Sequence, residues 1–273
     1  MKFNSKQLIL TAITVGLCAI LFMLGFKSPF GSSNSKGEES VALLSKFNGS
    51  SYIAEEKRKL SGALQDQLAE LEEEPNKQNY IAIAAIWDSL KVSYAAAAYT
   101  FKAADLDKTE FSWLAAGNRF YNVANFSNDS AMMLDALQQA KQSYNKVLEL
   151  NPNNLQAKTA LAVCIIQGDN DVMKGVGLLK EVVAKDSNNV QAIFTLGMLS
   201  IQSNQLDKAQ ERFEKLIKIE PFNAEYYFYL AEVYAKSGDT KKAVKTYETC
   251  KTLVKDKEAQ KEIDAIIEKL NKL

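Results

Sequence analysis

The stretch TLGMLSIQSNQLDKAQERFEKLIKIEPFNAEYYFYLAEVYAKSGDTKKAVKTYETC, residues 195–250, contains one pattern twice and decides the fold. In each copy a large and a small apolar residue stand together, an alanine follows 12 residues after the small one, and an aromatic residue stands four residues further on. A 34-residue period of this kind is typical of a helical solenoid, in which each repeat is a pair of helices. The marks are Leu196-Gly197, Ala209 and Phe213 in the first copy, and Leu230-Ala231, Ala243 and Tyr247 in the second.

The same pattern continues towards the N-terminus. Gly175 and Leu179 stand 34 residues before Ala209 and Phe213, whereas Leu161-Ala162 stand 35 residues before Leu196-Gly197. The one-residue difference places an insertion between the two helices of that unit, where a turn absorbs it. Two earlier and more divergent copies are marked by Tyr80, Ile83-Ala84, Trp87, Ala97 and Phe101, and by Trp113, Ala116-Gly117, Phe120, Ala140 and Tyr144.

These marks resemble the tetratricopeptide repeat, whose unit follows W-x2-L-G-x2-Y in its first helix, A-x3-F in its second, and proline at its end. Pro152 and Pro221 end two of the units here, while Thr109 stands where the first unit would have proline. The resemblance implies an all-α fold, a right-handed superhelix of about five helix pairs over residues 76–255. The repeats fall at about 76–109, 110–152, 153–187, 188–221 and 222–255, and residues 256–273 are predicted to form a C-terminal capping helix.

Packing explains the marks. A glycine or alanine on the first helix lets the second helix approach closely, and the aromatic residue of the second helix fills the space beside it. The second unit is longer, because Gly117 and Ala140 are 23 residues apart where the other units have about 12. We expect Asp129 or Ser130 to cap a helix of about 20 residues that ends at Leu150.

The composition excludes several classes of function. The 273 residues include 33 Lys plus Arg and 33 Asp plus Glu, so no net charge attracts nucleic acid. Histidine is absent, which removes histidine-based catalysis and histidine-ligated metals. The three cysteines, Cys18, Cys164 and Cys250, form no CxxC pair and are interpreted as small buried apolar residues. We therefore expect no enzyme activity, no cofactor and no metal site.

Residues 8–26 are predicted to be a transmembrane anchor. They carry no charge, and at about 1.5 Å per residue a helix of this length reaches roughly 28 Å, close to the thickness of the bilayer core. A cleaved signal peptide is the alternative, but its apolar part is usually about 7–15 residues, with a small-x-small site after it. Lys2, Lys6 and the terminal amine precede the span, which favours residues 1–7 in the cytoplasm and the repeats outside it. In a Gram-negative cell this is a single-pass inner-membrane protein with a periplasmic repeat domain.

Two segments connect the anchor to the repeats. Residues 27–51 are rich in serine, glycine and asparagine and are predicted to be a flexible linker. Residues 52–74 are predicted to be one amphipathic helix, with Ile53, Leu60, Leu64, Leu68 and Leu71 on one stripe. This stripe either packs on the first repeat or mediates self-association.

The resemblance also implies a binding surface. In tetratricopeptide repeats the first helices line a concave groove, and side chains there bind peptides or proteins. Amides can hydrogen-bond to a peptide backbone, and phenylalanine and methionine add apolar contact. The positions implied here are Asn118, Asn122, Gln156, Thr159, Gln167, Gln191, Phe194, Met198, Gln202, Glu225 and Phe228.

The sequence as a whole resembles membrane-anchored repeat proteins of Gram-negative bacteria. We expect a non-catalytic scaffold or adaptor that binds protein or peptide partners of unknown identity, in envelope assembly or protein export. Two alternatives stay open. One is a structural oligomer organised by the 52–74 helix, and the other is an accessory subunit of an enzyme complex such as that of cytochrome c assembly.

Overall fold

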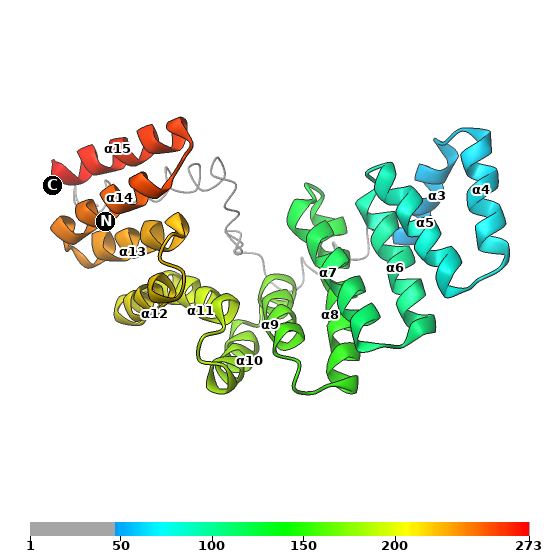
Figure 1. Cartoon of the computed structure of the whole chain (residues 1–273), viewed down its shortest axis with the longest axis horizontal. Coiled ribbons are helices and arrows are strands. Elements are labelled where there is room, and N and C mark those ends of the chain that lie inside the picture. Colours follow the sequence, from blue (N-terminus) through cyan, green and yellow to red (C-terminus); the bar gives the residue numbers. More distant parts are fainter. Residues whose placement is uncertain (1–46, 273) are drawn as a thin grey trace, which may run out of the picture. The chain divides into compact units, whose positions relative to one another are not determined.

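The computed structural model describes residues 47–272, and every regular element in this range is a helix (Figure 1). The all-α prediction is therefore confirmed for the described residues. Helices α3 to α9 are Gly49–Arg58, Gly62–Glu73, Lys77–Ser89, Ser93–Asp107, Glu110–Phe126, Ser130–Leu150 and Leu155–Cys164. After the π-helix η1 (Ile165–Asp169), helices α10 to α15 are Val172–Lys185, Val190–Gln202, Leu206–Ile219, Ala224–Ser237, Thr240–Leu253 and Lys257–Asn271.

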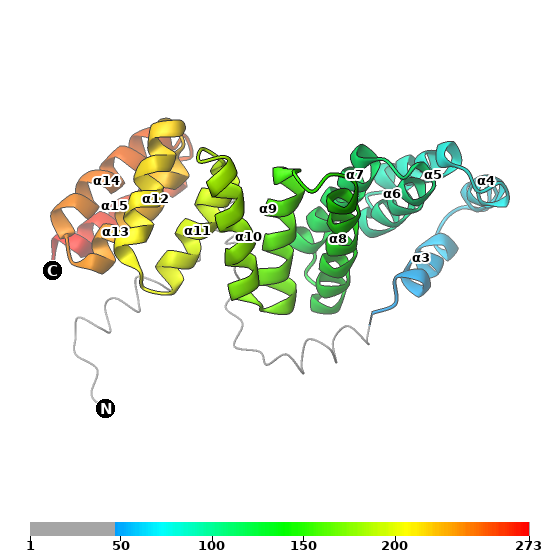
Figure 2. The same cartoon turned by 90° about the horizontal axis from the view of Figure 1, so that it is seen from below.

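The helices form two compact units, divided within α10. The described residues of the N-terminal unit are 47–178, and those of the C-terminal unit are 179–272. Within each unit, helices that follow one another in the chain pack side by side, as in the pairs α5–α6, α7–α8, α11–α12 and α13–α14 (Figure 2). The right-handed superhelix over all five pairs stays a prediction.

Small residues let paired helices approach closely. A Cβ atom on Gly117 of α7 would lie 2.7 Å from the ring of Tyr144 on α8, and a Cβ atom on Gly197 of α11 would lie 3.1 Å from the ring of Phe213 on α12. Tyr144 and Phe213 are both fully buried. This is the small-against-aromatic contact that the repeat pattern predicts.

Asparagines cap the first helices of three repeats. The side-chain oxygens of Asn154, Asn189 and Asn223 accept hydrogen bonds from backbone N–H groups in the first turn of the helix that follows, at 2.7, 3.0 and 3.1 Å. Such caps satisfy donors that the helix itself leaves unpaired. They fix where α9, α11 and α13 begin.

The extra residues of the second repeat lengthen its helices. Helix α7 has 17 residues and α8 has 21, with only Ser127, Asn128 and Asp129 between them. The Asp129 carboxylate accepts hydrogen bonds from the N–H groups of Ala131 and Met132, so the chain does cap α8 at the predicted place.

The prediction of one helix over residues 52–74 is wrong. The chain forms α3 and α4 there, and the break at residues 59–61 precedes Gly62. Helix α3 also begins earlier, at Gly49, because the Asn48 side chain accepts a hydrogen bond from the N–H of Ser51 at 2.9 Å. Residues 49–51 therefore belong to a helix and not to the predicted linker.

The leucine stripe of this region packs on the first helix pair. Leu68 is fully buried, and Leu60 and Leu71 pack against the same cluster, which includes Ile83 and Trp87 of α5. Of the two roles expected for the stripe, the structure therefore uses it for contact with the first repeat.

The predicted anchor over residues 8–26 lies outside the described residues, as do residues 1–7 and most of the predicted linker. Among residues 47–272, no helix has both the length and the apolar character needed to cross a bilayer.

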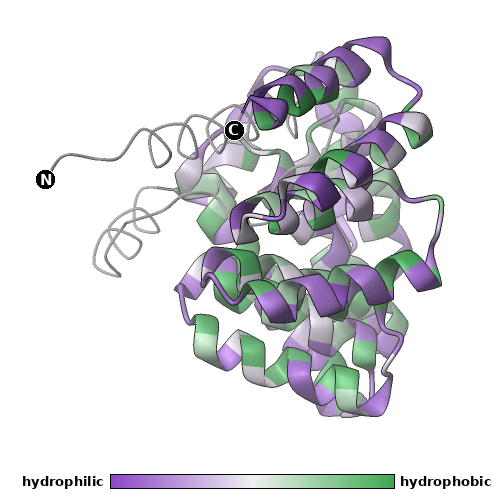
Figure 3. Ribbon diagram, turned by 90° about the vertical axis from the view of Figure 1, so that its left-hand side faces the viewer, coloured by the Kyte–Doolittle hydropathy of each residue, from purple (hydrophilic) through white to green (hydrophobic). Residues whose placement is uncertain are grey.

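The C-terminal unit ends in an amphipathic helix. Helix α15 packs on α14, and its Ile263, Ile266 and Leu270 are buried. Figure 3 shows hydrophobic and hydrophilic residues alternating along the helices at this end of the chain. The buried side closes the apolar face of the fifth helix pair, and the charged side faces solvent.

Candidate functional site

The predicted binding residues divide between the two units. Asn118, Asn122, Gln156, Thr159 and Gln167 belong to the N-terminal unit, and the other six belong to the C-terminal unit. Four of the eleven are exposed amides, namely Asn122, Gln156, Gln191 and Gln202. Asn118 and Gln167 are half-buried and hydrogen-bond within the fold, to the hydroxyls of Tyr144 and Tyr121 respectively. Exposed amides on first helices are therefore the part of the prediction that stays available to a partner.

Three of the predicted binding residues are buried and therefore cannot contact a partner in this structure. Thr159, Met198 and Phe228 are 3%, 6% and 0% exposed. The Thr159 hydroxyl donates to the backbone oxygen of Leu155 at 2.8 Å, and the Phe228 ring packs 5.5 Å from the Tyr247 ring. A first helix contacts both its own partner and its neighbours, so only a narrow strip of its surface faces solvent.

Phe194 also has a structural role. Its ring lies 5.6 Å from the ring of Tyr229 and about 6 Å from those of Phe213 and Tyr226, all in the core of the C-terminal unit. The half-buried Phe194 is therefore the edge of an aromatic cluster and not a free apolar contact for a peptide.

Glu225 lies in the first turn of α13 and is half-buried. Burial raises the pKa of its carboxyl to about 7. In the unfolded chain this group titrates near 4.5, so between these values the folded state binds more protons than the unfolded state. The free energy of unfolding must then fall as the pH rises from about 4.5 through about 7.

Glu225→Gln is expected to remove this loss of stability. The variant should be more stable than the unchanged chain at pH 8 by on the order of 1–2 kcal/mol and about equal to it at pH 4, because only the ionised carboxylate is penalised by burial. Urea unfolding at both pH values measures the difference. An equal decline in both proteins would contradict a buried carboxyl at this position.

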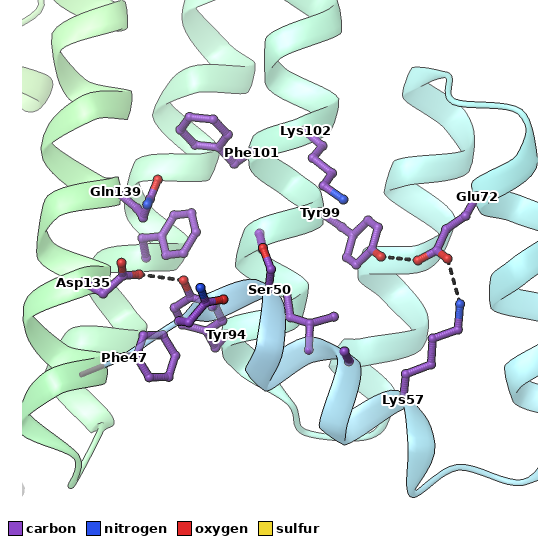
Figure 4. A pocket seen from close by; sticks show the side chains of 16 residues that line it. Phe47, Ser50, Lys57, Glu72, Tyr94, Tyr99, Phe101, Lys102, Asp135 and Gln139 are labelled. Atoms are coloured by element: carbon purple, nitrogen blue, oxygen red, sulfur yellow. Dashed lines mark hydrogen bonds and ion pairs between the residues drawn. The ribbon is translucent and has the colours of Figure 1, made fainter. Parts of the chain in front are cut away.

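A large pocket lies in the N-terminal unit, and none of the predicted binding residues lines it. It has a volume of about 690 Å³ and is bounded by α3, α6 and α8, with α4 and α7 at its edges (Figure 4). We call it the α3 pocket. Its apolar walls come from Phe47, Ile53, Tyr94, Ala98, Phe101 and Phe120, and its polar groups from Lys57, Glu72, Tyr99, Lys102, Asp135 and Gln139.

Aromatic contacts hold α3 on the rest of the unit. The Phe47 ring lies 4.9 Å from the Tyr94 ring of α6, and Tyr52 of α3 lies 5.7 Å from it. Gly49 sits so close that a Cβ atom there would collide with the hydroxyl of Tyr94. No described residue of α3 itself is fully buried. Helix α3 therefore lies on the surface of the unit, and its aromatic contact with α6 is made to Tyr94.

Two tyrosines connect the pocket's polar groups. The Tyr94 hydroxyl donates to the Asp135 carboxylate at 2.6 Å, and the Tyr99 hydroxyl donates to Glu72, which also accepts from Lys57 at 2.7 Å. Burial, and then the carboxylate partner, raise the pKa of each tyrosine far above its usual range. Burial would also raise the pKa of Glu72, but hydrogen bonds from Lys57 and Tyr99 outweigh it and lower that pKa. Both tyrosines are thus neutral donors and Glu72 is an anion.

Lys102 forms no salt bridge among residues 47–272, although its charge helps to lower the pKa of the Glu72 carboxyl. Its ammonium lies 4.4 Å from the centre of the Tyr99 ring and 5.6 Å from that of the Tyr80 ring. These cation–π contacts orient the side chain without neutralising it. A negatively charged group that enters the pocket therefore has a fixed lysine to pair with.

This pocket could not be found from the repeat pattern. Its walls come from the second helices α6 and α8 and from α3, and α3 lies outside the repeats. The signal in the sequence is Phe47 and Tyr52 on either side of the helix cap Asn48, in a stretch otherwise similar to a linker.

Among the described residues, no group of three or more cysteines, aspartates and glutamates is placed to hold a metal ion. The two described cysteines, Cys164 and Cys250, are buried, and burial raises the pKa of each thiol to about 12. They therefore remain protonated and are poor nucleophiles. The α3 pocket offers apolar contact, hydrogen bonds and the Lys102 charge to a bound group.

Comparison with known proteins identifies the repeats. Sequence models of the tetratricopeptide repeat match residues 134–154, 175–227 and 213–245. These residues therefore match tetratricopeptide repeats, as their pattern of small and aromatic residues predicts. Among curated proteins, FK506-binding protein 59 of Drosophila melanogaster is 38% identical over 63 residues, which are 23% of this chain and 14% of that protein. The chain thus matches only a small part of that relative.

Solved structures share the fold over a longer range. The structure of PilW, a widely conserved type IV pilus biogenesis factor, is 15% identical with a TM-score of 0.54, and covers 85% of this chain and 99% of PilW. The structure of MamA from Desulfovibrio magneticus RS-1 is 20% identical with a TM-score of 0.52, and covers 65% of this chain and 94% of MamA. At these identities the likeness concerns the fold alone.

Proposed function

We propose that this chain is a non-catalytic, membrane-anchored scaffold that binds segments of partner proteins, in envelope assembly or protein export. The α3 pocket carries this proposal. Its volume of about 690 Å³ accommodates several side chains of a peptide, and its walls combine aromatic surface with a few fixed polar groups. Binding sites for ligands typically have this composition.

The polar groups indicate what the pocket binds. Phe101 and Phe120 offer apolar contact, and Lys102 offers a positive charge that is not held in a salt bridge with a described carboxylate. The best fit is a segment with large apolar side chains and a carboxylate close to them. The exposed amides on the first helices, such as Gln156 in the N-terminal unit and Gln191 in the C-terminal unit, are separate candidates for hydrogen bonds to peptide partners.

The anchor and its orientation are part of the proposal. The uncharged stretch over residues 8–26 supports a membrane location, and the lysines before it support a periplasmic repeat domain. PilW, which shares the fold, is itself a pilus biogenesis factor, and this favours a role in assembling envelope structures.

The test is photo-crosslinking in the cell membrane. A benzophenone side chain at Gln139, on the pocket wall, is expected to crosslink the full-length chain to discrete protein partners, which mass spectrometry identifies. Ala98→Trp places an indole ring in the pocket from α6, where it takes the space of a partner's side chain. It should lower the crosslinked fraction about tenfold, and a tenfold loss of binding corresponds to roughly 1.4 kcal/mol. The chain should stay in the membrane pellet after an alkaline wash.

The matched control is Ala184→Trp, which adds the same side chain at an exposed position of α10. It should leave the crosslinks unchanged. Crosslinks that persist in Ala98→Trp would show that partners do not enter the pocket, and recovery of the chain in the wash would contradict the anchor.

A further inference from the structure

A second groove lies in the C-terminal unit, on the faces of α12 and α14 above α13. It has a volume of about 320 Å³ and is lined mainly by apolar atoms. Ile217, Tyr227, Leu230 and Tyr234 form its floor, and Lys218 and Lys245 stand at its sides. We call it the α12–α14 groove.

When the repeats are aligned, this groove and the α3 pocket are lined by equivalent repeat positions. Gly117 of α7 corresponds to Ala231 of α13, so Phe120 corresponds to Tyr234, and Lys102 of α6 corresponds to Glu214 of α12. Both Phe120 and Lys102 line the α3 pocket, and both Tyr234 and Glu214 line the α12–α14 groove. The two sites thus lie between the second helices of adjacent pairs, over the first helix between them.

The N-terminal unit shows what this kind of groove accepts. There the short helix α3 lies against it, with the aromatic side chains of Phe47 and Tyr52 on Tyr94 and Ile53 packed on the same cluster. Among the described residues, the α12–α14 groove has no such helix, and its Lys218 and Lys245 are exposed. By comparison with α3, the fitting occupant is a short amphipathic helix.

Charge specifies the occupant further. Lys218 and Lys245 have no ion-pair partner among the described residues, and the Glu214 carboxylate already accepts from Tyr234 at 3.0 Å and from Gln210 at 2.8 Å. The Glu214 carboxylate keeps its negative charge, so the groove lining carries two lysines against one acid and a net positive charge. A second copy of α3 is a poor match, because its Glu55 and Glu56 are balanced by Lys57 and Arg58.

We propose that the α12–α14 groove binds an acidic amphipathic helix of a partner protein. Its apolar side chains lie on Tyr227, Leu230 and Tyr234, and its carboxylates pair with Lys218 and Lys245. This site is separate from the α3 pocket and does not depend on the function assigned to that pocket.

The test uses designed peptides and the full-length chain in detergent. The first probe is a fluorescent 14-residue helix with leucine and phenylalanine on one face and glutamates on the other, and the second has lysines in place of the glutamates. Fluorescence anisotropy should show salt-sensitive binding of the acidic peptide only. Lys218→Glu with Lys245→Glu should weaken its binding about tenfold or more. The double variant should in turn bind the basic peptide, because the charges are then reversed on both sides.

The control variant is Lys241→Glu with Lys255→Glu, which makes the same change in charge at exposed positions that do not line the groove. It should bind the acidic peptide as the unchanged chain does. Equal binding of the acidic peptide to both double variants, or no binding at all, would overturn the proposal. So would a dimer of the full chain that dissociates in Lys218→Glu with Lys245→Glu, since the occupant would then be a second copy.

Discussion

Phe228→Ala is expected to lower the free energy of unfolding by about 3–5 kcal/mol, although residue 228 is a position where the family would place a partner contact. Phe228 is fully buried, with its ring 5.9 Å from Tyr229 and 5.5 Å from Tyr247. Its removal leaves a cavity between α13 and α14 that two large neighbouring rings cannot collapse to fill. Urea unfolding of the full-length chain, followed by far-ultraviolet circular dichroism, measures the loss.

Phe222→Ala is the matched control. Phe222 is 84% exposed in the turn before α13, so truncating it removes little buried surface and should change stability by less than about 0.5 kcal/mol. If Phe228→Ala were as harmless as Phe222→Ala, Phe228 would face solvent, and its assignment to a binding surface would be restored. A loss in Phe228→Ala alone establishes it as core.

Phe228 and Gln191 show which binding positions could be predicted from the repeat pattern and which could not. Both positions follow from the same assignment of first helices to a groove, yet one is fully buried and the other exposed. The repeat pattern marks some of the contacts inside a helix pair, such as that of Gly117 with Tyr144. It does not mark the contact of Phe228 with Tyr247 of the same pair, and it does not specify how much of the remaining face an adjacent pair covers.

Helix α3 illustrates the second limit. The helix pairs could be predicted because each repeats the same spacing, and five copies reinforce one another. Residues 47–58 occur once, and the serine- and glycine-rich sequence before them hides the helix. Only the aromatic contacts with Tyr94, which join residues more than 40 positions apart, place α3 on α6 and create the pocket beside it.

The repeat pattern and the structure also give different predictions for Gly175, the small residue at the start of the second helix of the third repeat. The other four units have alanine at this mark, at Ala97, Ala140, Ala209 and Ala243, and all four are fully buried. The pattern alone therefore predicts that Gly175→Ala is harmless. It even predicts a gain, since alanine favours a helix interior over glycine by about 0.5–1 kcal/mol.

The structure predicts the opposite result. A Cβ atom on Gly175 would lie 2.6 Å from Cδ1 of Ile166 and 2.9 Å from the backbone oxygen of Ala162. The side chain of Ile166 can shift, but the α9 backbone cannot do so without disturbing the helix. Ile166 belongs to the π-helix η1, whose wider turn follows α9 directly, and the third unit alone has such an element among the described residues. The local backbone therefore leaves less room here than at the other four marks.

Gly175→Ala is accordingly expected to destabilise the chain by about 2–3 kcal/mol through overpacking. Gly177→Ala, two residues along the same helix, should stabilise it by about 0.5–1 kcal/mol, because Gly177 is exposed and its Cβ atom would meet no other atom within 4 Å. Thermal and urea unfolding of both variants measure the two changes, which have opposite signs. A gain in both would mean that helix propensity outweighs the contact with Ala162, and that α9 and α10 lie further apart than the structure has them. A loss in Gly175→Ala alone would confirm the close approach of α10 to α9 at this position.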